Sequence, residues 1–225
     1  MNTFFLSKTP LFHGISEENI TDLLACLNAR EHTYNKNEVI IRAGNPTKDI
    51  GLVVSGSVNL VVNFYWGDTH IFGHVETGAI FAENSAAIQG KESMYDVVAS
   101  EPCIILFLSM ENLITTCSNN CPHHLKLIHN LLSICAQKNL ELSSRMMHTA
   151  PKSLRARLLS YLSEQAMINC SSHFTIPFNR QQLADYLAVD RSALSNELSK
   201  MQRDGLITVK KNEFTLSQVF TTSHT

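Results

Sequence analysis

Four polar residues between positions 191 and 196 have the types and the spacing needed to read the edges of DNA bases. Arg191 can bind a guanine edge through two hydrogen bonds, and Asn196 can bind an adenine edge in the same way. The hydroxyls of Ser192 and Ser195 can bond to either base. Apolar side chains recur in this stretch at spacings of four and three residues, at Leu194, Leu198 and Met201. This periodicity predicts a helix that buries one face and exposes the four polar residues on the other.

A second, shorter helix is predicted directly before this one. Asn179 can cap it by accepting a hydrogen bond from its first turn, and Gln182 can reach back to the amide of Asn179, which is the capping-box arrangement. The residues of its apolar face are Leu183, Ala184 and Leu187. A side chain as small as that of alanine allows another helix to cross closely. With Asp190 expected to cap the longer helix, the pair predicts a helix-turn-helix.

A β-hairpin is predicted after the two helices. Asp204 and Gly205 end the longer helix, and apolar residues follow in two short runs, 206–209 and 214–216, around a basic tip at 210–212. Such a wing can contact the phosphates of DNA. The residues expected to contact phosphates are Arg180, Lys200, Lys210 and Lys211. A small helical bundle with polar outer faces is the alternative for the same stretch.

The turn between the two helices contains one unfavourable residue. Helix-turn-helix motifs usually place glycine in this turn, because the backbone there is left-handed, but this chain has Ala188. We expect Ala188 to adopt that conformation at a cost of about 1 kcal/mol.

The charge of the chain is divided unevenly between its two ends. The net charge is −2, which alone would argue against a nucleic-acid partner. Residues 1–144 carry 8 basic and 14 acidic residues, a net charge of −6, whereas residues 145–225 carry 10 and 6, a net charge of +4. The basic end is the end that contains the expected helix-turn-helix, as attraction to phosphate requires. Merely uneven surface charge is the alternative explanation.

Length and composition limit the class of protein. A chain of 225 residues with 44% hydrophobic residues can form one or two domains with real cores. The first twelve residues lack the basic and apolar segments of a signal peptide, and no apolar run approaches the roughly 18 residues needed to span a bilayer. The six cysteines form no CxxC pair, so reduced thiols and a cytoplasmic location are expected.

The region from residue 37 to residue 108 has the character of a β-roll. After a short helix that begins near Ser16, short apolar runs alternate with turns containing glycine. The runs fall at 39–41, 51–54, 58–62, 70–75, 79–81, 96–99 and 104–108. We predict an antiparallel β-roll of the jelly-roll type, and therefore an α+β fold for the whole chain.

A long helix is predicted after the β-roll, with Pro122 in its first turn. Its apolar positions step alternately by three and four residues, through Leu125, Ile128, Leu132, Cys135, Asn139, Leu142 and Met146. This heptad seam predicts that two such helices pair in a dimer, in which the amide of Asn139 can fix the register. A second stripe faces the β-roll, at Leu127, Leu131 and Ile134. The alternatives are an ordinary core helix and, for Cys135, a redox-switched disulfide across the dimer.

The stretch 149–151, Thr-Ala-Pro, breaks the long helix and is the expected hinge before the next one. The expected domains are a sensory β-roll (1–120), a dimerisation helix (121–148) and a winged helix-turn-helix (149–225).

Two groups of residues suggest metal chemistry instead. His70, His74 and Glu76 would share one face of an unbroken strand, which would suit a cupin-like metalloprotein or metalloenzyme. Cys117, Cys121, His123 and His124 could hold zinc, although their spacing is not that of a zinc finger. The regulatory interpretation involves no catalytic residue and no metal.

The order of these parts resembles the Crp/Fnr family of bacterial transcription regulators. The resemblance extends from residue 11 to residue 216, and its most specific segments are Val-Ser-Gly-Ser-Val at 54–58, Gly-Ala-Ile-Phe at 78–81, and 183–207. It implies a homodimer that binds palindromic DNA, receives a signal at the β-roll and contacts RNA polymerase if it activates transcription. A DNA binder that needs no ligand is a further possibility.

The resemblance also locates the effector pocket and shows departures from the family. The corresponding residues are Phe72, Phe81, Glu83, Asn84, Ser93, Met94 and Leu131. Members that bind cyclic nucleotides have Gly-Glu and then Arg-Ser or Arg-Thr, where this chain has Ala82-Glu83 and Ser93-Met94. Without that cation, burial of a phosphate is costly, which argues against cyclic AMP.

Two further departures concern the iron–sulfur cluster and the DNA site. Cys26 is the one cysteine near the N-terminus, where iron–sulfur members of the family have several, which argues against such a cluster. Asn196 stands where an arginine is frequent in the family, so a different DNA half-site is expected.

Overall fold

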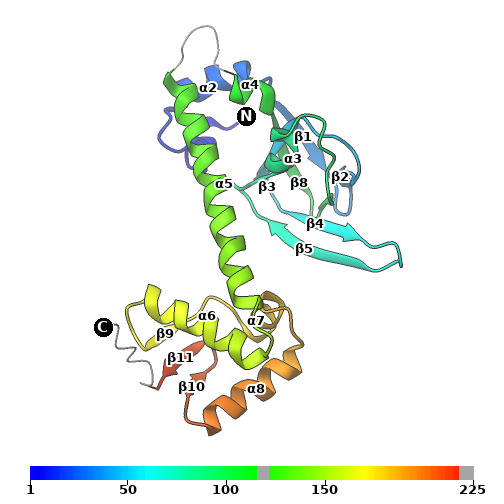
Figure 1. Ribbon diagram of the computed structural model, residues 1–225. Helices are drawn as coiled ribbons and strands as arrows, with labels where there is room; N and C mark the ends of the chain where they lie inside the picture. The colour runs from blue at the N-terminus through cyan, green and yellow to red at the C-terminus, as the bar shows by residue number, and fades with distance from the viewer. Residues whose placement is uncertain (116–121, 218–225) are drawn as a thin grey trace. The chain divides into compact units, whose positions relative to one another are not determined.

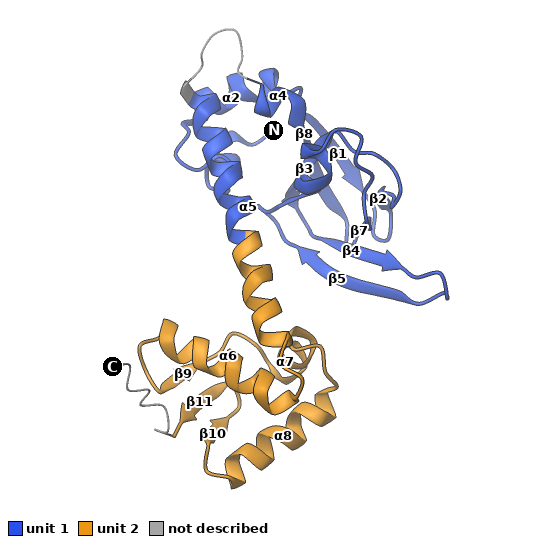
Figure 2. Cartoon of the chain, in the orientation of Figure 1, with its two compact units in different colours: residues 1–137 blue, residues 138–225 orange. Residues whose placement is uncertain are grey.

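The chain folds into two compact units, Met1–Gln137 and Lys138–Thr225 (Figures 1 and 2). The computed structural model describes residues 1–115 and 122–217. The long helix α5 (Pro122–Thr149) coincides within one residue with the helix expected at 121–148. The boundary between the two units lies inside α5, so the helix is divided between them.

The first unit contains two four-stranded antiparallel sheets, as expected for a β-roll. One sheet has the order β1-β8-β3-β6, with β1 (Arg30–Tyr34), β8 (Cys103–Ser109), β3 (Asp49–Ser55) and β6 (Ile80–Phe81). The other has the order β2-β7-β4-β5, with β2 (Val39–Ile41), β7 (Asp96–Ala99), β4 (Val58–Asn63) and β5 (Thr69–Val75). Strand β1 was not predicted, because its sequence, Arg-Glu-His-Thr-Tyr, contains no apolar run. Four of its five residues are exposed.

Gly56 makes the corner between β3 and β4. Its φ of +75° is one that residues with a side chain rarely adopt, and a Cβ there would lie 2.6 Å from the carbonyl oxygen of Pro102. The turn expected at Ser55 and Gly56 therefore depends on glycine for two reasons.

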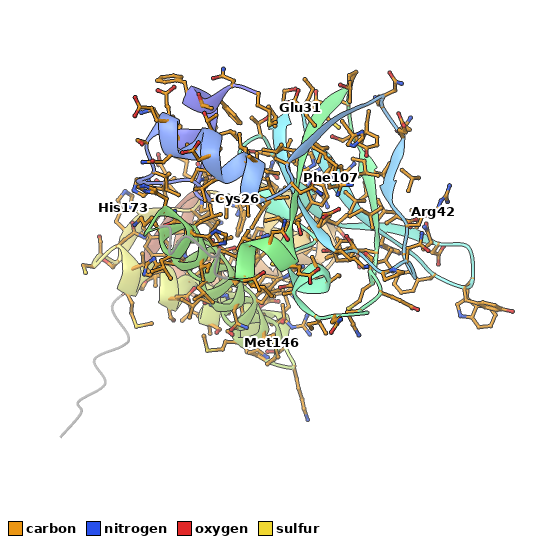
Figure 3. The ribbon with its side chains drawn as sticks, turned by 90° about the horizontal axis from the view of Figure 1, so that it is seen from above. Cys26, Glu31, Arg42, Phe107, Met146 and His173 are labelled. Carbon is orange, nitrogen blue, oxygen red and sulfur yellow. The ribbon has the colours of Figure 1, made fainter. Side chains whose placement is uncertain are left out.

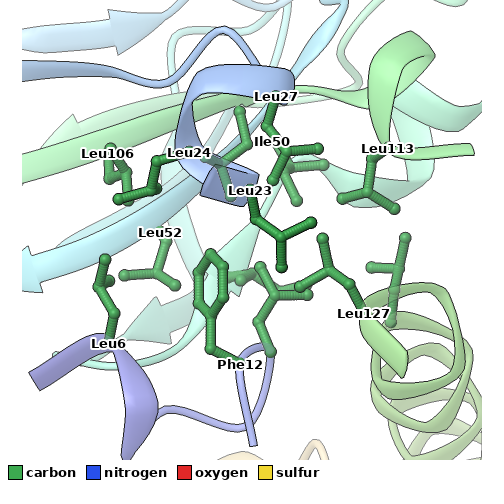
Figure 4. Packing of buried hydrophobic residues seen from close by; sticks show 14 of the residues in the cluster. Leu6, Phe12, Leu23, Leu24, Leu27, Ile50, Leu52, Leu106, Leu113 and Leu127 are labelled. Atoms are coloured by element: carbon green, nitrogen blue, oxygen red, sulfur yellow. The ribbon is translucent and has the colours of Figure 1, made fainter. Parts of the chain in front are cut away.

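Four short helices belong to the same unit: α1 (Thr3–Ser7), α2 (Glu17–Cys26), α3 (Glu83–Ala87) and α4 (Met110–Ile114). Apolar residues from α2, β3, β8 and the first part of α5 bury one another, among them Leu23, Leu52, Leu106 and Leu127 (Figure 4). Leu131 is buried in this cluster and Ile134 packs against it, which confirms the second apolar stripe predicted for the long helix.

The amide of Asn130 also ties α5 to the N-terminal segment. Its Nδ2 donates to the carbonyl oxygens of Leu11, at 2.9 Å, and His13, at 2.8 Å. Because Asn130 is buried, these bonds satisfy a group whose burial would otherwise be costly.

The second unit contains three helices after α5 and a three-stranded sheet with the order β10-β11-β9. The elements are α6 (Leu154–Ile168), β9 (His173–Thr175), α7 (Arg180–Tyr186), α8 (Arg191–Arg203), β10 (Ile207–Lys210) and β11 (Glu213–Leu216). Leu183 and Ala184 of α7, Leu194 and Leu198 of α8, and Phe214 of β11 form the centre of its core. This is the predicted helix-turn-helix followed by a hairpin wing.

The caps of the two helices differ. The capping box of α7 is confirmed, because Asn179 Oδ1 accepts from the amide of Gln182 at 3.0 Å and Gln182 Oε1 accepts from the amide of Asn179 at 2.8 Å. Asp190 is the N-cap residue of α8, as predicted, although its side chain makes no capping hydrogen bond. Ala188 has a φ of +54°, as the turn requires.

Candidate nucleic-acid interface

Helix α8 separates an apolar face from a polar one as predicted. Leu194, Leu198 and Met201 are buried in the core of the second unit. The four candidate base-reading residues are all exposed: Arg191, Ser192, Ser195 and Asn196. No other described part of this unit covers these four side chains, so the polar face of α8 can contact a partner molecule.

The serine hydroxyls of α8 are already oriented. Ser195 Oγ donates to the carbonyl oxygen of Arg191 at 2.9 Å, and Ser199 Oγ donates to that of Ser195, also at 2.9 Å. Because each proton is used within the helix, the oxygens remain free to accept. In this orientation Ser195 suits a donor on a base edge, such as the amino group of adenine or cytosine.

A groove of about 600 Å³ lies where the start of α7, the start of α8 and the tip of the wing meet. Its lining contains Arg180, Arg191 and Lys211, one cation from each of these three places. The remaining lining residues carry no acidic group: Pro177, Phe178, Asn179, Gln181, Gln182 and Asn212. The structure thus brings together a predicted base-reading residue and two predicted phosphate-contacting residues around one cationic groove.

Arg180 is held in place by an aromatic ring. Its guanidinium lies 5.5 Å from the ring centroid of Phe214, and partial burial lowers the pKa of Arg180. An arginine remains charged in proteins in spite of such a shift. The cation–π contact therefore positions a permanent positive charge on the groove.

The tip of the wing is fastened to the segment before α7. Lys211 has a φ of +56°, and next to it Asn212 Nδ2 donates to the carbonyl oxygen of Ile176 at 3.2 Å. The amide of Ile176 in turn donates to the carbonyl oxygen of Asn212 at 3.0 Å. These two hydrogen bonds of Asn212 thus hold the tip of the wing, with Lys211, close to the segment before α7.

The other two predicted phosphate contacts stand apart from the groove. Lys200 Nζ lies 3.8 Å from Oε2 of Glu197, and Lys210 is the cross-strand neighbour of Glu213. Neither lines the groove, and each has an acidic neighbour that offsets its charge. Their contribution to phosphate binding is expected to be smaller than that of Arg180 and Lys211.

Arg155 of α6 positions α8 and was not recognised in the sequence. Its Nε lies 2.7 Å from Oε1 of Glu197, and its Nη1 lies 2.6 Å from Oδ2 of Asp204, so one guanidinium holds the middle and the end of α8. No local pattern marks this residue, since the partners are remote in sequence and only the packing of α6 on α8 brings them together.

The face of α5 with the heptad seam carries exposed apolar side chains. Leu125 is 62% exposed, Leu132 64% and Met146 71%, and Leu142 and Asn139 are exposed as well, whereas Ile128 and Cys135 are partly buried. Figure 3 shows the side chains from above, with Met146 labelled. Such a row of large apolar groups on one helix suits a second helix rather than water.

The residues expected at the effector pocket are distributed over different parts of the first unit. Phe81 packs with Val53 and Ile105 in one buried cluster, whereas Leu131 lies in the other. Glu83 and Ser93 are buried, Asn84 and Met94 are exposed, and Phe72 lies at the surface with its ring centroid 5.0 Å from that of Tyr95. The structure thus places the seven residues in two buried clusters and at the surface of the first unit.

The residues that correspond to the family's phosphate site carry no positive charge. Ala82, at the N-cap of α3, has a φ of +64°, a conformation that glycine adopts more readily than alanine. Ser93 Oγ donates to the carbonyl oxygen of Tyr95 at 2.6 Å. Burial, followed by the nearby carboxylate of Glu83, raises the pKa of Tyr95. These neighbours of α3 are neutral or acidic, which does not suit a phosphate.

The structure does not assemble the expected histidine face. A bulge between β4 and β5 pairs His74 with Asn59 but His70 with Val62, so the two histidines lie on opposite faces, and the expectation of a shared face was wrong. His74 Nδ1 lies 2.7 Å from Oδ1 of Asn59. Within residues 1–115 and 122–217 no three His, Cys, Asp or Glu residues are grouped to hold a metal ion.

The second candidate metal group is only partly described. Cys117 and Cys121 lie outside the described residues. His124 is buried, and its Nε2 makes a 2.8 Å hydrogen bond with the carbonyl oxygen of Leu113. Nε2 of His124 is therefore hydrogen-bonded to a backbone carbonyl.

Comparison with known proteins identifies both units. Residues 31–120 match the family model of the cyclic nucleotide-binding domain, and residues 156–219 match that of the Crp-like helix-turn-helix domain. The two matches follow one another along the chain as the β-roll and the winged helix do in the structure. The chain belongs to the Crp/Fnr family of transcription regulators.

Individual Crp/Fnr relatives are distant in sequence. Electron transport regulator A of Shewanella oneidensis is 23% identical over 198 residues, which are 85% of this chain and 76% of that protein. The structure of CprK complexed with OCPA has a TM-score of 0.61 at 15% identity, covering 88% of this chain and 91% of that one. The c-di-GMP-responsive regulator CLP of Xanthomonas campestris has a TM-score of 0.56 at 18% identity, covering 91% and 100%.

Membership of the Crp/Fnr family decides the class of the protein. Its members are DNA-binding regulators and not enzymes. The sheets, the long helix and the helix-turn-helix have the α+β arrangement of that family. Among the described residues, no helix is both long enough and apolar enough to cross a membrane.

Proposed function

We propose that this protein is a homodimer that reads a palindromic DNA site with its two α8 helices, under the control of a signal at the β-roll. The cationic groove is the observation that carries the DNA contact, because it presents Arg180, Arg191 and Lys211 together without an acidic lining residue. Arg191, Ser192, Ser195 and Asn196 would read bases, and Arg180 and Lys211 would hold phosphates, with smaller contributions from Lys200 and Lys210.

The exposed seam of α5 supports the dimer. Seven residues at heptad spacing form it, and four of them are large apolar side chains that are exposed in the isolated chain: Leu125, Leu132, Leu142 and Met146. Pairing of two such helices would bury them, at a gain of about 25 cal/mol for each Å² removed from water. In a symmetric dimer the two α8 helices would meet half-sites about 34 Å apart, one turn of DNA.

The signal is proposed to be something other than cyclic AMP. A cyclic phosphate needs a cation, but Ser93 and Met94 stand where the arginine pair would be, and Ser93 Oγ is bonded to the backbone of Tyr95. Of two proteins with this fold, CprK forms a complex with OCPA and CLP responds to c-di-GMP. Different effectors therefore occur on this fold, and no iron–sulfur cluster is invoked.

The effector would act as a population shift. A ligand that changes the packing of the β-roll against Leu127, Leu131 and Ile134 would change the pairing of the long helices, and the segment 149–151 would transmit the change to the DNA-binding unit. The protein would act in the cytoplasm, where its DNA lies, and would contact RNA polymerase if it activates transcription.

Selection of bound DNA from a random pool tests this function. The full-length protein should enrich an inverted repeat with half-sites about 10 base pairs apart, and enrichment that needs cell extract would show dependence on a signal. The matched controls are Arg191→Ala, which should lose enrichment, and Arg203→Ala, at the other end of α8, which should retain it. No enrichment with or without extract would contradict DNA binding, and a single half-site would contradict the dimer.

A further inference from the structure

The last turn of α5 binds the end of the first helix of the helix-turn-helix. Arg145 Nη2 donates to the carbonyl oxygen of Asp185 at 3.0 Å, and its Nε donates to that of Tyr186 at 3.1 Å. The final carbonyls of a helix have no partner within it and carry partial negative charge, so a guanidinium both satisfies and neutralises them. The same guanidinium lies 5.7 Å from the ring centroid of Tyr186.

Arg157 of α6 extends this clamp. Its Nη1 donates to the carbonyl oxygen of Leu187 at 3.1 Å, and its Nε donates to that of Pro151 at 2.9 Å. Three consecutive carbonyls at the end of α7 are therefore bound by two arginines, one from α5 and one from α6.

His148, one turn after Arg145, bonds to both neighbouring helices. It is 2% exposed, its Nδ1 lies 2.9 Å from the hydroxyl of Tyr186 in α7, and its Nε2 lies 3.2 Å from Oε2 of Glu164 in α6. The other oxygen of Glu164 accepts from Ser144 Oγ at 3.1 Å. One imidazole thus joins α5, α6 and α7.

The hydroxyl of Tyr186 can donate to His148 only while His148 is neutral. The neutral ring can donate from Nε2 to the carboxylate of Glu164 and accept at Nδ1 from the hydroxyl of Tyr186. Protonation turns Nδ1 into a donor, so the hydroxyl of Tyr186 must turn its proton away. The rings of Tyr161 and Phe178 pack against the Tyr186 ring, and the Tyr161 hydroxyl is itself buried without a partner.

The charged groups around His148 have opposing effects. Glu164 faces it from α6 and favours the charged ring, whereas the guanidinium of Arg145 lies over the neighbouring Tyr186 ring, and Tyr161 and Tyr186 contribute apolar ring surface at 5.4 Å and 5.8 Å. Burial outweighs the carboxylate and lowers the pKa of His148 below its usual 6.5. The unfolded chain therefore binds the proton more readily than the folded one.

We infer that His148, Glu164 and Tyr186 form a proton-sensitive latch, which holds the last turn of α5 against α7 when His148 is neutral and loosens when it is protonated. Since α7 begins at the cationic groove, loosening the latch would disturb the groove as well. Its stabilising effect is complete above pH 6.5 and is lost as the pH falls below that value. The effect on DNA rests on the proposed function, but the latch itself does not.

Hydrogen exchange of the full-length protein tests the latch without DNA. The amides of residues 142–149 and 180–188 should lose protection in the wild type as the pH falls below 6.5, relative to His148→Gln at the same pH, since comparison at one pH cancels the chemical exchange rate. Glutamine can keep the bond to Glu164 but does not titrate. His173→Gln is the matched control, because His173 is an exposed histidine of the same unit and its loss should leave the wild-type pH profile unchanged.

Two further variants separate a titrating latch from a purely structural contact. Glu164→Gln removes the group that favours the charged ring, so the midpoint should move to lower pH. Tyr186→Phe removes a hydrogen bond that only the neutral ring accepts, so the midpoint should move to higher pH. Profiles of the wild type and His148→Gln that run parallel, or midpoints of the two variants that do not separate, would overturn the latch.

Binding to the DNA selected above completes the test. The affinity of the wild type should fall between pH 7.5 and pH 5.5 more steeply than that of His148→Gln. A normal exchange result without any DNA binding would reject the proposed function and leave the latch intact. DNA binding with identical pH profiles in both proteins would support the proposed function and reject the coupling of the latch to the cationic groove.

Discussion

At the scale of single residues, we propose different tasks for the three cations around one groove. Arg191 begins α8 and can reach a base edge, whereas Lys211 lies at the tip of the wing, and Arg180 is packed on Phe214. Base contacts specify a sequence and phosphate contacts only position the protein on it. Substitutions in the groove should therefore have separable effects.

Arg191→Ala should lose about 1–3 kcal/mol of specific binding and relax the preference at one base pair of each half-site. Lys211→Ala should weaken binding to all sequences alike and reduce the slope of affinity against salt concentration by about one. Titrations of the selected site and its point variants at several salt concentrations measure both. Equal effects of the two substitutions on every sequence would contradict the base-reading role of Arg191.

Ala188 is the residue at which a local rule is broken. Its φ of +54° costs an L-residue roughly 1–2 kcal/mol, which glycine avoids at the expense of some chain entropy. Ala188→Gly should therefore leave the stability of the second unit unchanged or raise it by up to about 1 kcal/mol in urea unfolding. Ala193→Gly, in the first turn of α8, is the control and should destabilise it by about 0.5–1 kcal/mol. Equal destabilisation by both would show that no strain exists at Ala188.

At the scale of elements, the caps and faces of the helices decide how α5, α7 and α8 pack. α7 has only seven residues, too few to be stable alone, and its capping box and the two arginines at its other end satisfy groups that a short helix leaves exposed. Helix α5 has one face buried in the first unit and another that carries the seam. The packing within one chain buries the first face, but it leaves the apolar side chains of the seam exposed.

Leu132→Glu should convert the proposed dimer to a monomer, because it places a charge at the middle of the seam. Ser133→Glu is the matched control, since residue 133 is also exposed on α5 but lies outside the seam. Sedimentation equilibrium distinguishes the two states, and DNA affinity should fall only for the first variant. A dimeric Leu132→Glu protein would exclude the seam as the dimer contact.

At the scale of the whole molecule, an acidic part with the β-roll and a basic part with the helix-turn-helix are joined in one chain. The net charge of −6 on residues 1–144 keeps phosphate away from the β-roll, and the net charge of +4 on residues 145–225 attracts it to the helix-turn-helix. This division suits a protein that receives its signal at one unit and binds DNA with the other.

Calorimetric titration of the full-length protein with cyclic AMP should show no binding at micromolar concentrations. The physical reason is the absence of a cation at Ser93 and Met94, together with the carboxylate of Glu83 beside Tyr95. Titration with the selected DNA duplex in the same buffer is the positive control. Micromolar affinity for cyclic AMP would contradict the proposal that the signal is of another kind.

The features that the sequence determined by itself are local ones. The capping box at Asn179, the two faces of α8, the positive φ at Ala188 and the second stripe of α5 all depend on residues a few positions apart, whose contacts are set by the geometry of a single helix or turn. The positions of the β-roll strands along the chain were also predicted, apart from β1, because apolar runs and glycine turns mark each strand separately.

The contacts decided only by tertiary structure join residues that are far apart in the chain. One bulge placed His70 and His74 on opposite faces, against the alternation expected of an unbroken strand. The bonds of Arg145 to the end of α7 span 40 and 41 residues, and those of Arg155 and His148 likewise depend on how α5, α6, α7 and α8 pack. Nothing in the spacing of these residues predicts their partners, since packing and not helical periodicity brings them together.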